Sequence, residues 1–369
     1  MNPTRIRDLH ISVGTLPTGK LNKITDVPGV RVGHATIDTD RQKTGVTVII
    51  PAEGNLFTRP LTAACHIING YGKSAGLMQV QELGTLETPI ALTGTLNVGK
   101  IHDALVRYTI EQCESEGKAC RSVNPVVGET NDGTLSANND RPADKSHLDA
   151  AIAAATVDFA EGDVGAGKGT VCLGLKGGIG SASRLLEMGE RTFTLGVLVQ
   201  TNFGCVENLR MDGLPVGRAV VDMLHEERAA AEAVTGQDDI GSIMIIVGTD
   251  LPVSELQLTR ILRRATVGLA RTGSYIGHGS GDVVIGFTTA NRRGGDDGGA
   301  TRTVEILHDG KLEKAFAAVA ECVEEAIYNS MIAADTVTGF NGRDTVTVRA
   351  LNEFLPEALD RARAYAGGR

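Results

Sequence analysis

Short runs of Val, Ile and Leu alternate along this chain with segments of helical period, and this alternation constrains its fold more than any other feature. A strand that is apolar on consecutive residues must be covered on both faces, so we expect helices on both sides of a sheet. The predicted strands are residues 45–50, 89–95, 122–127, 171–175, 194–200, 242–247 and 282–288. The predicted helices are residues 100–116, 145–155, 216–234, 253–270, 311–334 and 352–366. The pattern predicts a layered α/β or α+β architecture.

The composition indicates a folded protein with small side chains. The 369 residues include 46 Gly and no Trp, 41% of them are hydrophobic, and the net charge is -9. This hydrophobic content excludes a disordered chain, and the length fits one large domain or two. Because no basic excess exists to neutralise phosphates or anionic lipid, we expect neither nucleic acid nor a membrane as partner.

The chain shows no targeting segment and no dense cysteine framework. Its first residues lack an apolar signal region, and no run approaches the ~18 apolar residues of a spanning helix, which predicts a cytoplasmic protein. The six cysteines are spread over the chain and are interpreted as free thiols, with one predicted helix carrying both Cys113 and Cys120. The others are Cys65, Cys172, Cys205 and Cys322.

The sequence contains no complete phosphate-binding loop and no metal-binding motif. Residues 162–170, GDVGAGKGT, approach a phosphate loop, but Gly169 stands where the Mg²⁺-binding hydroxyl belongs, so we interpret these glycines as turns and close packing. The eight His form no H-E-x-x-H or H-x-x-x-H pair, and no Cys-x-x-Cys occurs. The sequence therefore predicts neither a metal site nor a cofactor.

The dipeptide Gly241-Ser242, at the start of the run SIMIIV, suits cleavage of the chain by its own backbone. Glycine leaves its carbonyl open to attack and tolerates the strained backbone that attack requires. An N-to-O acyl shift and hydrolysis would then free the α-amine of Ser242, which titrates at about 8 and suits a general base. The dipeptide alone is weak support, since four Gly-Ser pairs occur, ending at Ser181, Ser242, Ser274 and Ser280.

A second candidate pair lies in the segment Ser280-Gly281-Asp282. Residues i and i+2 of an extended segment share a face, which places a hydroxyl beside a carboxylate. The alternative is a turn that leads into the strand VVIGF. Nearby His278 is a further titratable candidate, against the alternative of an ordinary loop residue.

Eight stretches together resemble the DmpA-type L-aminopeptidase/D-esterase family of self-processing N-terminal serine hydrolases, which includes β-peptidyl aminopeptidases. They follow the family's order from about residue 24 to about residue 290, and the remaining C-terminal part carries less of the resemblance. The stretches are ITDVPGVRVGHATI, TGVTVIIP, ETPIALTGTLNVG, NPVVGETNDG, GLKGGIGSASR, GVLVQTNFG, GSIMIIVGTDLP and GLARTGSYIGHGSGDVVIGFTT.

The resemblance implies a four-layer α-β-β-α sandwich, of the type shared with ornithine acetyltransferase, in one domain spanning 1–369. It also implies a cut between Gly241 and Ser242 into chains 1–241 and 242–369. Ser242 would be the nucleophile, with Ser280 and Asp282 supporting it. Asp282 stands where some members of the family carry Glu. Homotetramers of such cut units are implied as well.

The resemblance also assigns residues that contact the substrate. Asn202 would donate to the oxyanion, a contact commonly worth ~10² to 10³ in rate. Glu129, expected on the loop after the strand 122–127, would hold the free ammonium of the substrate. Asn131 stands where characterised peptidases of the family carry tyrosine, which leaves the substrate open.

These observations favour an aminopeptidase or amidase that acts on small peptides, amides or esters with a free amine. One alternative is an acyltransferase resembling ornithine acetyltransferase, a family that has threonine at the scissile position instead of Ser242. Another is an uncut binding protein on the same fold, with Asn131 as its sign.

Overall fold

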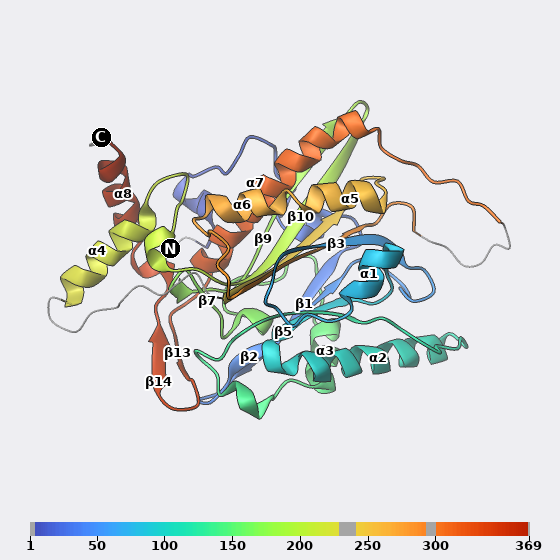
Figure 1. Cartoon of the computed structure of the whole chain (residues 1–369), viewed down its shortest axis with the longest axis horizontal. Coiled ribbons are helices and arrows are strands. Elements are labelled where there is room, and N and C mark those ends of the chain that lie inside the picture. Colours follow the sequence, from blue (N-terminus) through green and yellow to red (C-terminus); the bar gives the residue numbers. More distant parts are fainter. Residues whose placement is uncertain (1–3, 229–240, 293–299, 368–369) are drawn as a thin grey trace.

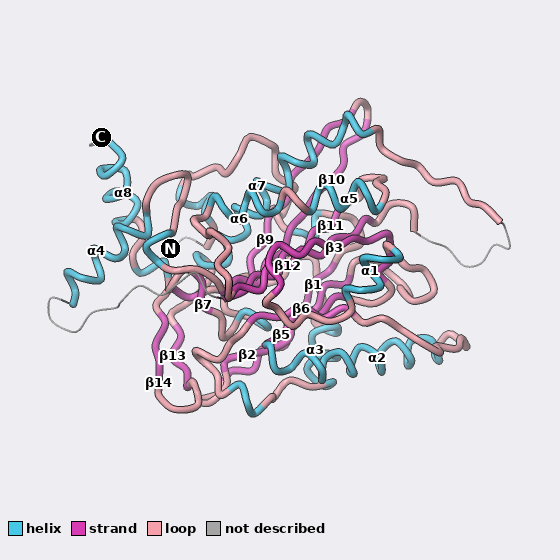
Figure 2. Tube along the Cα trace, viewed as in Figure 1, coloured by secondary structure: helices cyan, strands magenta, loops and turns pink. Residues whose placement is uncertain are grey.

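The computed structural model describes residues 4–228, 241–292 and 300–367. Two sheets pack face to face between two helical layers, as Figure 1 shows, and the strands fill the middle of the molecule in Figure 2. The first sheet has the order β1-β2-β5-β6, formed by β1 (Arg31–Asp38), β2 (Lys43–Ile50), β5 (Ile90–Gly94) and β6 (Val126–Thr130). The second has the order β4-β3-β12-β11-β10-β9, formed by β4 (Thr85–Leu86), β3 (Leu61–Gly70), β12 (Ser280–Thr288), β11 (Gly241–Thr249), β10 (Arg191–Asn202) and β9 (Ile179–Met188).

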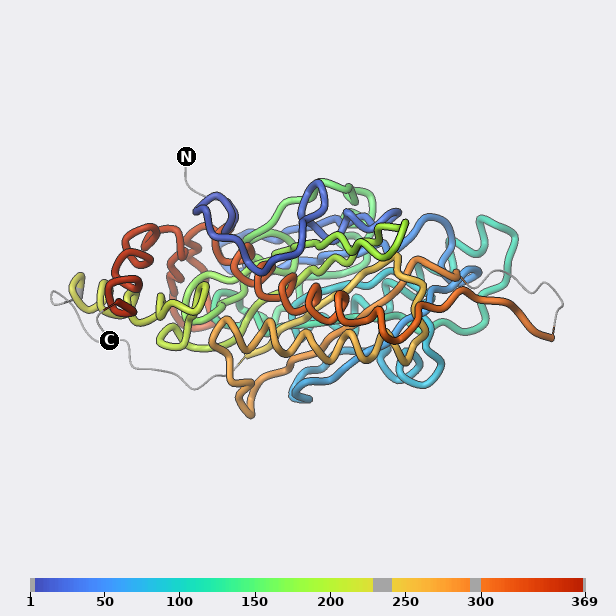
Figure 3. The backbone as a smooth tube through the Cα atoms, turned by 90° about the horizontal axis from the view of Figure 1, so that it is seen from above, coloured from blue at the N-terminus to red at the C-terminus, as the bar shows by residue number. Residues whose placement is uncertain are grey.

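The helices cover the outer faces of the two sheets. The four-stranded sheet packs on α2 (Val98–Ser115) and α3 (Lys145–Ala153), and the six-stranded sheet on α5 (Glu255–Leu262) and α7 (Leu312–Ile332). Helix α6 (Ala265–Arg271) lies beside α7 in Figure 3. The predicted α-β-β-α arrangement is therefore confirmed.

Shorter elements complete the structure. Helix α1 (Leu77–Leu83) contacts β3, while α4 (Val216–Arg228) and α8 (Glu357–Gly367) pack together at one end of the molecule (Figure 1). Two small hairpins are formed by β7 (Val171–Cys172) with β8 (Leu175–Lys176) and by β13 (Val337–Phe340) with β14 (Thr345–Val348). Within the described parts, no helix combines the length and apolar character that crossing a membrane requires.

The apolar runs are buried on both faces, as the sequence predicted. On β11, Met244 and Ile246 belong to the core between the two sheets, whereas Ile243 and Ile245 belong to the core under α7. This alternation follows from the two-residue period of a strand. It determines which face of the six-stranded sheet each site residue occupies.

Several predicted boundaries were wrong for local reasons. The predicted strand 171–175 is instead the β7–β8 hairpin, because Leu173 and Gly174 turn the chain with φ of 49° and 68°. The predicted helix 253–270 is broken, since the N–H of Arg264 bonds the carbonyl of Ile261, three residues back, and α6 starts afresh. Strand β6 and helix α8 begin late, each just after a proline, at Pro125 and Pro356.

Further differences concern elements that the sequence did not predict and segments that end earlier than expected. The sequence predicted neither β1, β3 and β9 nor helix α1. The last part of the predicted helix 216–234 lies outside the described residues, as does most of the loop 292–300. Helix α2 ends at Ser115, so Cys120 lies beyond it and the two cysteines do not share a helix. All six cysteines are free, as predicted.

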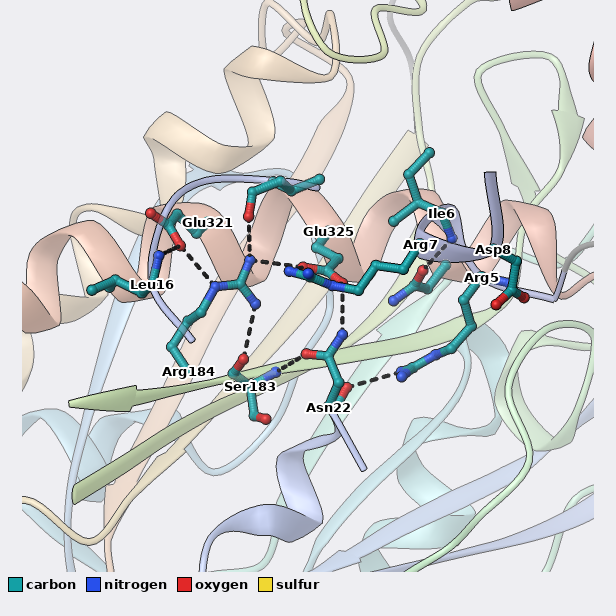
Figure 4. A network of polar contacts seen from close by, with 12 residues as sticks. Arg5, Ile6, Arg7, Asp8, Leu16, Asn22, Ser183, Arg184, Glu321 and Glu325 are labelled. Carbon is teal, nitrogen blue, oxygen red and sulfur yellow. Dashed lines mark hydrogen bonds and ion pairs between the residues drawn. The ribbon is translucent and has the colours of Figure 1, made fainter. Parts of the chain in front are cut away.

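A buried ion network ties the N-terminal segment to the six-stranded sheet and to α7 (Figure 4). Arg184 on β9 donates to Glu321 and to Glu325 on α7, each at 2.7 Å. Arg7 donates to Glu325 at 2.6 and 2.9 Å, and Asn22 donates to the same carboxylate at 2.6 Å. The side chains of Arg184 and Glu325 are both fully buried, so neither charge can turn to water.

Candidate active site

Three adjacent strands of the six-stranded sheet bring the predicted residues together at their ends. In the antiparallel pair β10–β11, Asn202 lies opposite Ser242, and in the parallel pair β11–β12, Ser242 lies opposite Gly281. Residues far apart in the sequence thus become neighbours across the sheet. The predicted grouping of Asn202, Ser242 and the segment 280–282 corresponds to this register.

Gly241 has a backbone that other residues rarely adopt, with a φ of 143°. A Cβ there would lie 2.0 Å from the carbonyl oxygen of Asn202 and 2.8 Å from the Cα of Phe203. The Ser242 hydroxyl donates to the Gly241 carbonyl oxygen at 2.5 Å. The hydroxyl therefore contacts the peptide group that self-cleavage would break.

Two further glycines, Gly281 and Gly72, lie close to Ser242. A Cβ at Gly281 would lie 3.0 Å from the Ser242 Oγ and 2.6 Å from the Cα of Gly72. The segment around Gly72 thus lies directly over the reacting group, and Ser242 is buried. A side chain at Gly281 would therefore collide with Gly72, whereas a Cβ at Gly72 would lie 3.5 Å from the Gly281 Cα.

Asn202 presents a carboxamide whose orientation is fixed by a backbone bond. Its Oδ1 accepts a hydrogen bond from the Val171 N–H at 2.9 Å. Because the carbonyl side of the amide is held this way, the Nδ2 group is the side free to donate to a substrate oxygen. A neutral donor on the residue opposite Ser242 is what an oxyanion site requires.

Ser280 and Asp282 form the predicted pair. The Ser280 hydroxyl donates to Asp282 Oδ1 at 2.7 Å, and both side chains are buried. Since Gly281 faces the Ser242 hydroxyl, the alternation of β12 directs Ser280 and Asp282 to the opposite face of the sheet. The pair therefore lies behind the strand, relative to the Ser242 hydroxyl.

Glu129 reaches the site from the other sheet. It lies inside β6, so its predicted place on a loop was wrong, because β6 begins only after Pro125 and continues to Thr130. Its Oε1 accepts from the Lys73 N–H at 2.6 Å, and its Oε2 accepts from the Thr95 hydroxyl. A Cβ at Gly72 would lie 3.3 Å from Oε1, so the segment over Ser242 also contacts this buried carboxylate.

Asn131 is exposed and belongs to its own loop. Its Oδ1 accepts from the Gly133 N–H at 2.8 Å and from the Asn138 Nδ2 at 3.3 Å. The carboxamide is thus engaged within residues 131–138. His278, the other titratable candidate, lies in the turn before β12 with its ring 6.4 Å from that of Tyr71.

Sequence reasoning missed two buried ionisable residues near the site. Burial raises the pKa of Asp132 to about 6, and the charge of Glu129 adds to the rise. Burial lowers the pKa of Lys176 to about 7. Both residues lie within stretches that resemble the family, GETNDG and GLKGGIG, and that position was the only signal for them.

The glycines of residues 162–170 pack closely, as predicted. Gly162 and Gly165 have φ of 87° and 51°, and a Cβ at Gly165 would lie 2.5 Å from the Thr47 hydroxyl.

Among residues 4–228, 241–292 and 300–367, no group of three His, Cys, Asp or Glu side chains is arranged to hold a metal ion.

Comparisons with known proteins match nearly the whole chain. The sequence pattern of peptidase family S58 matches residues 22–345. The β-peptidyl aminopeptidase BapA of Sphingosinicella microcystinivorans is 37% identical over 353 residues, which cover 92% of this chain and 88% of that protein.

Two solved structures extend the comparison to the fold. The β-aminopeptidase of Burkholderia sp. matches with a TM-score of 0.84 and 39% identity, over 97% of this chain and 99% of that one. The L-aminopeptidase D-Ala-esterase/amidase of Ochrobactrum anthropi matches with a TM-score of 0.86 and 34% identity, over 97% and 99% of the two chains. That enzyme is described as a prototype of the serine aminopeptidases and as a variant of the Ntn hydrolase fold.

Proposed function

Since the chain belongs to peptidase family S58 and is an N-terminal serine aminopeptidase, we propose that it cuts itself between Gly241 and Ser242 and uses the released Ser242 as its nucleophile. The observation that carries this proposal is the contact of the Ser242 hydroxyl with the Gly241 carbonyl, at a φ that requires glycine. Family membership does not favour the acyltransferase or the uncut binding protein.

Self-cleavage needs only groups at this junction and water. The Ser242 Oγ attacks the carbonyl carbon of Gly241, the bond from that carbon to the Ser242 nitrogen breaks, and the nitrogen takes the hydroxyl proton. Water then hydrolyses the resulting ester, which leaves a carboxylate on Gly241 and both a hydroxyl and an amine on Ser242. The cut divides the single proposed domain into chains 1–241 and 242–369.

Substrate cleavage uses the same residue in its free form. The α-amine of Ser242, with a pKa of about 8 in unperturbed chains, accepts the Oγ proton as Oγ attacks the substrate carbonyl. The Nδ2 group of Asn202 donates to the developing oxyanion. The leaving amine takes the proton, and water resolves the acyl-enzyme.

Ser280 and Asp282 support this proton transfer from behind β12. The Ser280 hydroxyl holds the buried carboxylate of Asp282 in place by a hydrogen bond. The negative charge of that carboxylate favours the ammonium that the Ser242 amine becomes as Oγ attacks. Glu129 accepts from the free ammonium of the substrate, beside the N–H of Lys73. The substrates are small peptides, amides or esters with a free amine, and amides of β-amino acids belong to the set to be assayed.

Assembly and location complete the proposal. Large apolar side chains are exposed along α1, β3 and α5, where Ile67, Met78, Leu83 and Leu256 are 48%, 85%, 58% and 68% exposed. An exposed apolar face of this kind favours association, and we propose a homotetramer of cut units. Six free thiols fit a cytoplasmic protein.

The test combines processing and activity in one preparation. Purified protein is analysed by intact mass and assayed on an L-amino acid p-nitroanilide and its N-acetylated counterpart. The proposal expects a cut chain that reacts only with the free-amine substrate. Equal rates on both substrates would contradict the role of Glu129, and an uncut yet active chain would contradict the role of the Ser242 amine.

A further inference from the structure

Lys176 is a fully buried lysine whose side-chain ammonium donates hydrogen bonds to three backbone carbonyls. Its Nζ donates to the carbonyl oxygens of Gly167, Thr170 and Gly177 at 3.0, 2.8 and 2.7 Å. Three acceptors match the three N–H groups of an ammonium, so the protonated side chain is satisfied. None of these acceptors carries a charge that would offset the burial of the ammonium.

Burying the ammonium of a lysine without a charged partner costs free energy of folding. Burial disfavours the charged form and lowers the pKa of Lys176 to about 7, although the nearby Asp163 opposes this shift. An apolar side chain of similar length would fill the same volume without that cost. The geometry around Thr170 indicates what the ammonium contributes to the candidate site.

One peptide unit connects Lys176 to the candidate oxyanion donor. The carbonyl that accepts from Lys176 Nζ belongs to Thr170, and the N–H on the other side of the same peptide bond belongs to Val171. That N–H is the group that donates to Asn202 Oδ1 at 2.9 Å. Lys176 Nζ, the Thr170–Val171 peptide and the Asn202 carboxamide thus form a continuous chain of hydrogen bonds that ends at Asn202 Nδ2.

We propose that Lys176 is a positioning residue for the oxyanion site, which fixes and polarises the Thr170–Val171 peptide and, through it, the carboxamide of Asn202. The inference rests on the proposed role of Asn202. An ammonium at one end of a hydrogen-bond chain strengthens each donor along it, because every bond polarises the next. The Nδ2 group then meets the developing oxyanion already oriented, without a cost of reorganisation.

The same peptide is held from a second side, which explains why it is a rigid element. The Thr170 carbonyl also accepts from the Gly177 N–H at 3.1 Å, and the Leu173 N–H donates to the Phe203 carbonyl next to Asn202. The β7–β8 hairpin is therefore attached to the end of β10 at several points. Lys176 is the part of this attachment that carries charge.

The experiment is a double-mutant cycle on the self-processed enzyme, with kcat and KM measured per cut chain and the cut fraction taken from intact mass. Lys176→Met removes all three donors, and Lys176→Gln keeps two. Lys168→Met is the matched control, because Lys168 lies between Gly167 and Thr170, whose carbonyls bond Lys176, but itself bonds the carboxylates of Asp38 and Asp163.

We expect Lys176→Met to lower kcat by about 10-fold or more with KM changed less than about 3-fold, and Lys176→Gln to fall between it and the wild type. In an Asn202→Ala background, Lys176→Met should change kcat by less than about 2-fold, since the group it acts through is gone. Lys168→Met should leave kcat within about 2-fold of the wild type.

Several outcomes would overturn the proposal. An equal fall of kcat in both backgrounds, a fall as large in Lys168→Met, or a rise of KM at unchanged kcat would each do so. If neither Lys176 variant yields folded, cut enzyme, Lys176 is a folding residue and the proposal fails. A wild-type kcat in Asn202→Ala alone would instead show that the role proposed for Asn202 is wrong.

Discussion

At position 241 the chain needs a residue without a side chain, and this requirement is testable. Ala at position 241 would hold a Cβ 2.0 Å from the Asn202 carbonyl oxygen at a φ of 143°. Strain of this kind costs about 1 to 3 kcal/mol, so we expect Gly241→Ala to displace the scissile carbonyl and to remain largely uncut. Gly99→Ala is the control, because a Cβ there meets nothing within 4 Å. Normal cleavage of Gly241→Ala, judged by gel electrophoresis, would contradict this account.

Glu129 supplies the prediction on substrate recognition. Glu129→Gln keeps the shape of the side chain and removes its charge, so the contact with an ammonium loses roughly 1.5 to 3 kcal/mol. For a free-amine p-nitroanilide, kcat/KM should fall ~10 to 150-fold. The N-acetylated substrate, which should react with neither the wild type nor the variant, is the negative control. An unchanged kcat/KM would show that Glu129 serves only Lys73 and Thr95, its partners in the structure.

The buried carboxyl of Asp132, close in sequence to Glu129, should make the stability of the protein depend on pH. Its pKa is about 6 in the folded protein and about 3.9 in an unfolded chain, so the folded state binds the proton more tightly. The stability from this group is fully present below about pH 4 and is lost as pH rises through about 6.

Asp132→Asn removes that loss. Its melting temperature should exceed that of the wild type at pH 8, by an amount equivalent to at most about 3 kcal/mol, and the difference should shrink toward pH 4. Asp335→Asn, at an exposed position, is the control. A variant less stable than the wild type at pH 8 would contradict this assignment.

At the scale of the element, the ion network between β9 and α7 makes the clearest prediction. Glu325→Ala leaves the fully buried Arg184 with less compensation, which costs about 3 to 5 kcal/mol. The measurement is thermal unfolding in the Ser242→Ala background, so that a single uncut chain unfolds. Asp360→Ala, which removes an exposed pair with Arg363, should change little. A similar melting temperature for both variants would show that the network adds no stability.

The predicted and missed strands differ in the kind of residue that they bury. Strands such as β11 were predicted because apolar residues face both a helical layer and the opposite sheet. Strand β9 was missed because its two faces carry the polar residues Arg184, toward α7, and Ser183, on the opposite face, whose partners come from distant segments. Periodicity reports burial in apolar cores and cannot report such polar burial.

For the site, the chemistry-bearing residues were predictable and their supports were not. Ser242, Asn202 and the pair of Ser280 with Asp282 combine side-chain types with a recognisable motif. Lys73 and Lys176 act on or through backbone groups, Lys73 by its N–H and Lys176 by its bonds to carbonyls. No residue pattern encodes a backbone contact made in three dimensions.

At the scale of the whole molecule, the proposed cut would not separate the structure. Strands β11 and β12 belong to the fragment 242–369, yet they lie between β3 and β10 of the fragment 1–241 in the six-stranded sheet. Two fragments joined by these ladders and by the cores on both faces should elute as one species in native size-exclusion chromatography. They should separate only in denaturant, and separate elution under native conditions would contradict the shared sheet.

Intact mass spectrometry of the wild type and of Ser242→Ala tests the central claim most directly. The wild type should give two fragments of roughly 25 and 13 kDa, by residue share of 38.7 kDa, with the smaller beginning at Ser242. Ser242→Ala should give one uncut, inactive chain. An active wild type that remains a single chain, or a Ser242→Ala variant that is cut normally, would contradict the account.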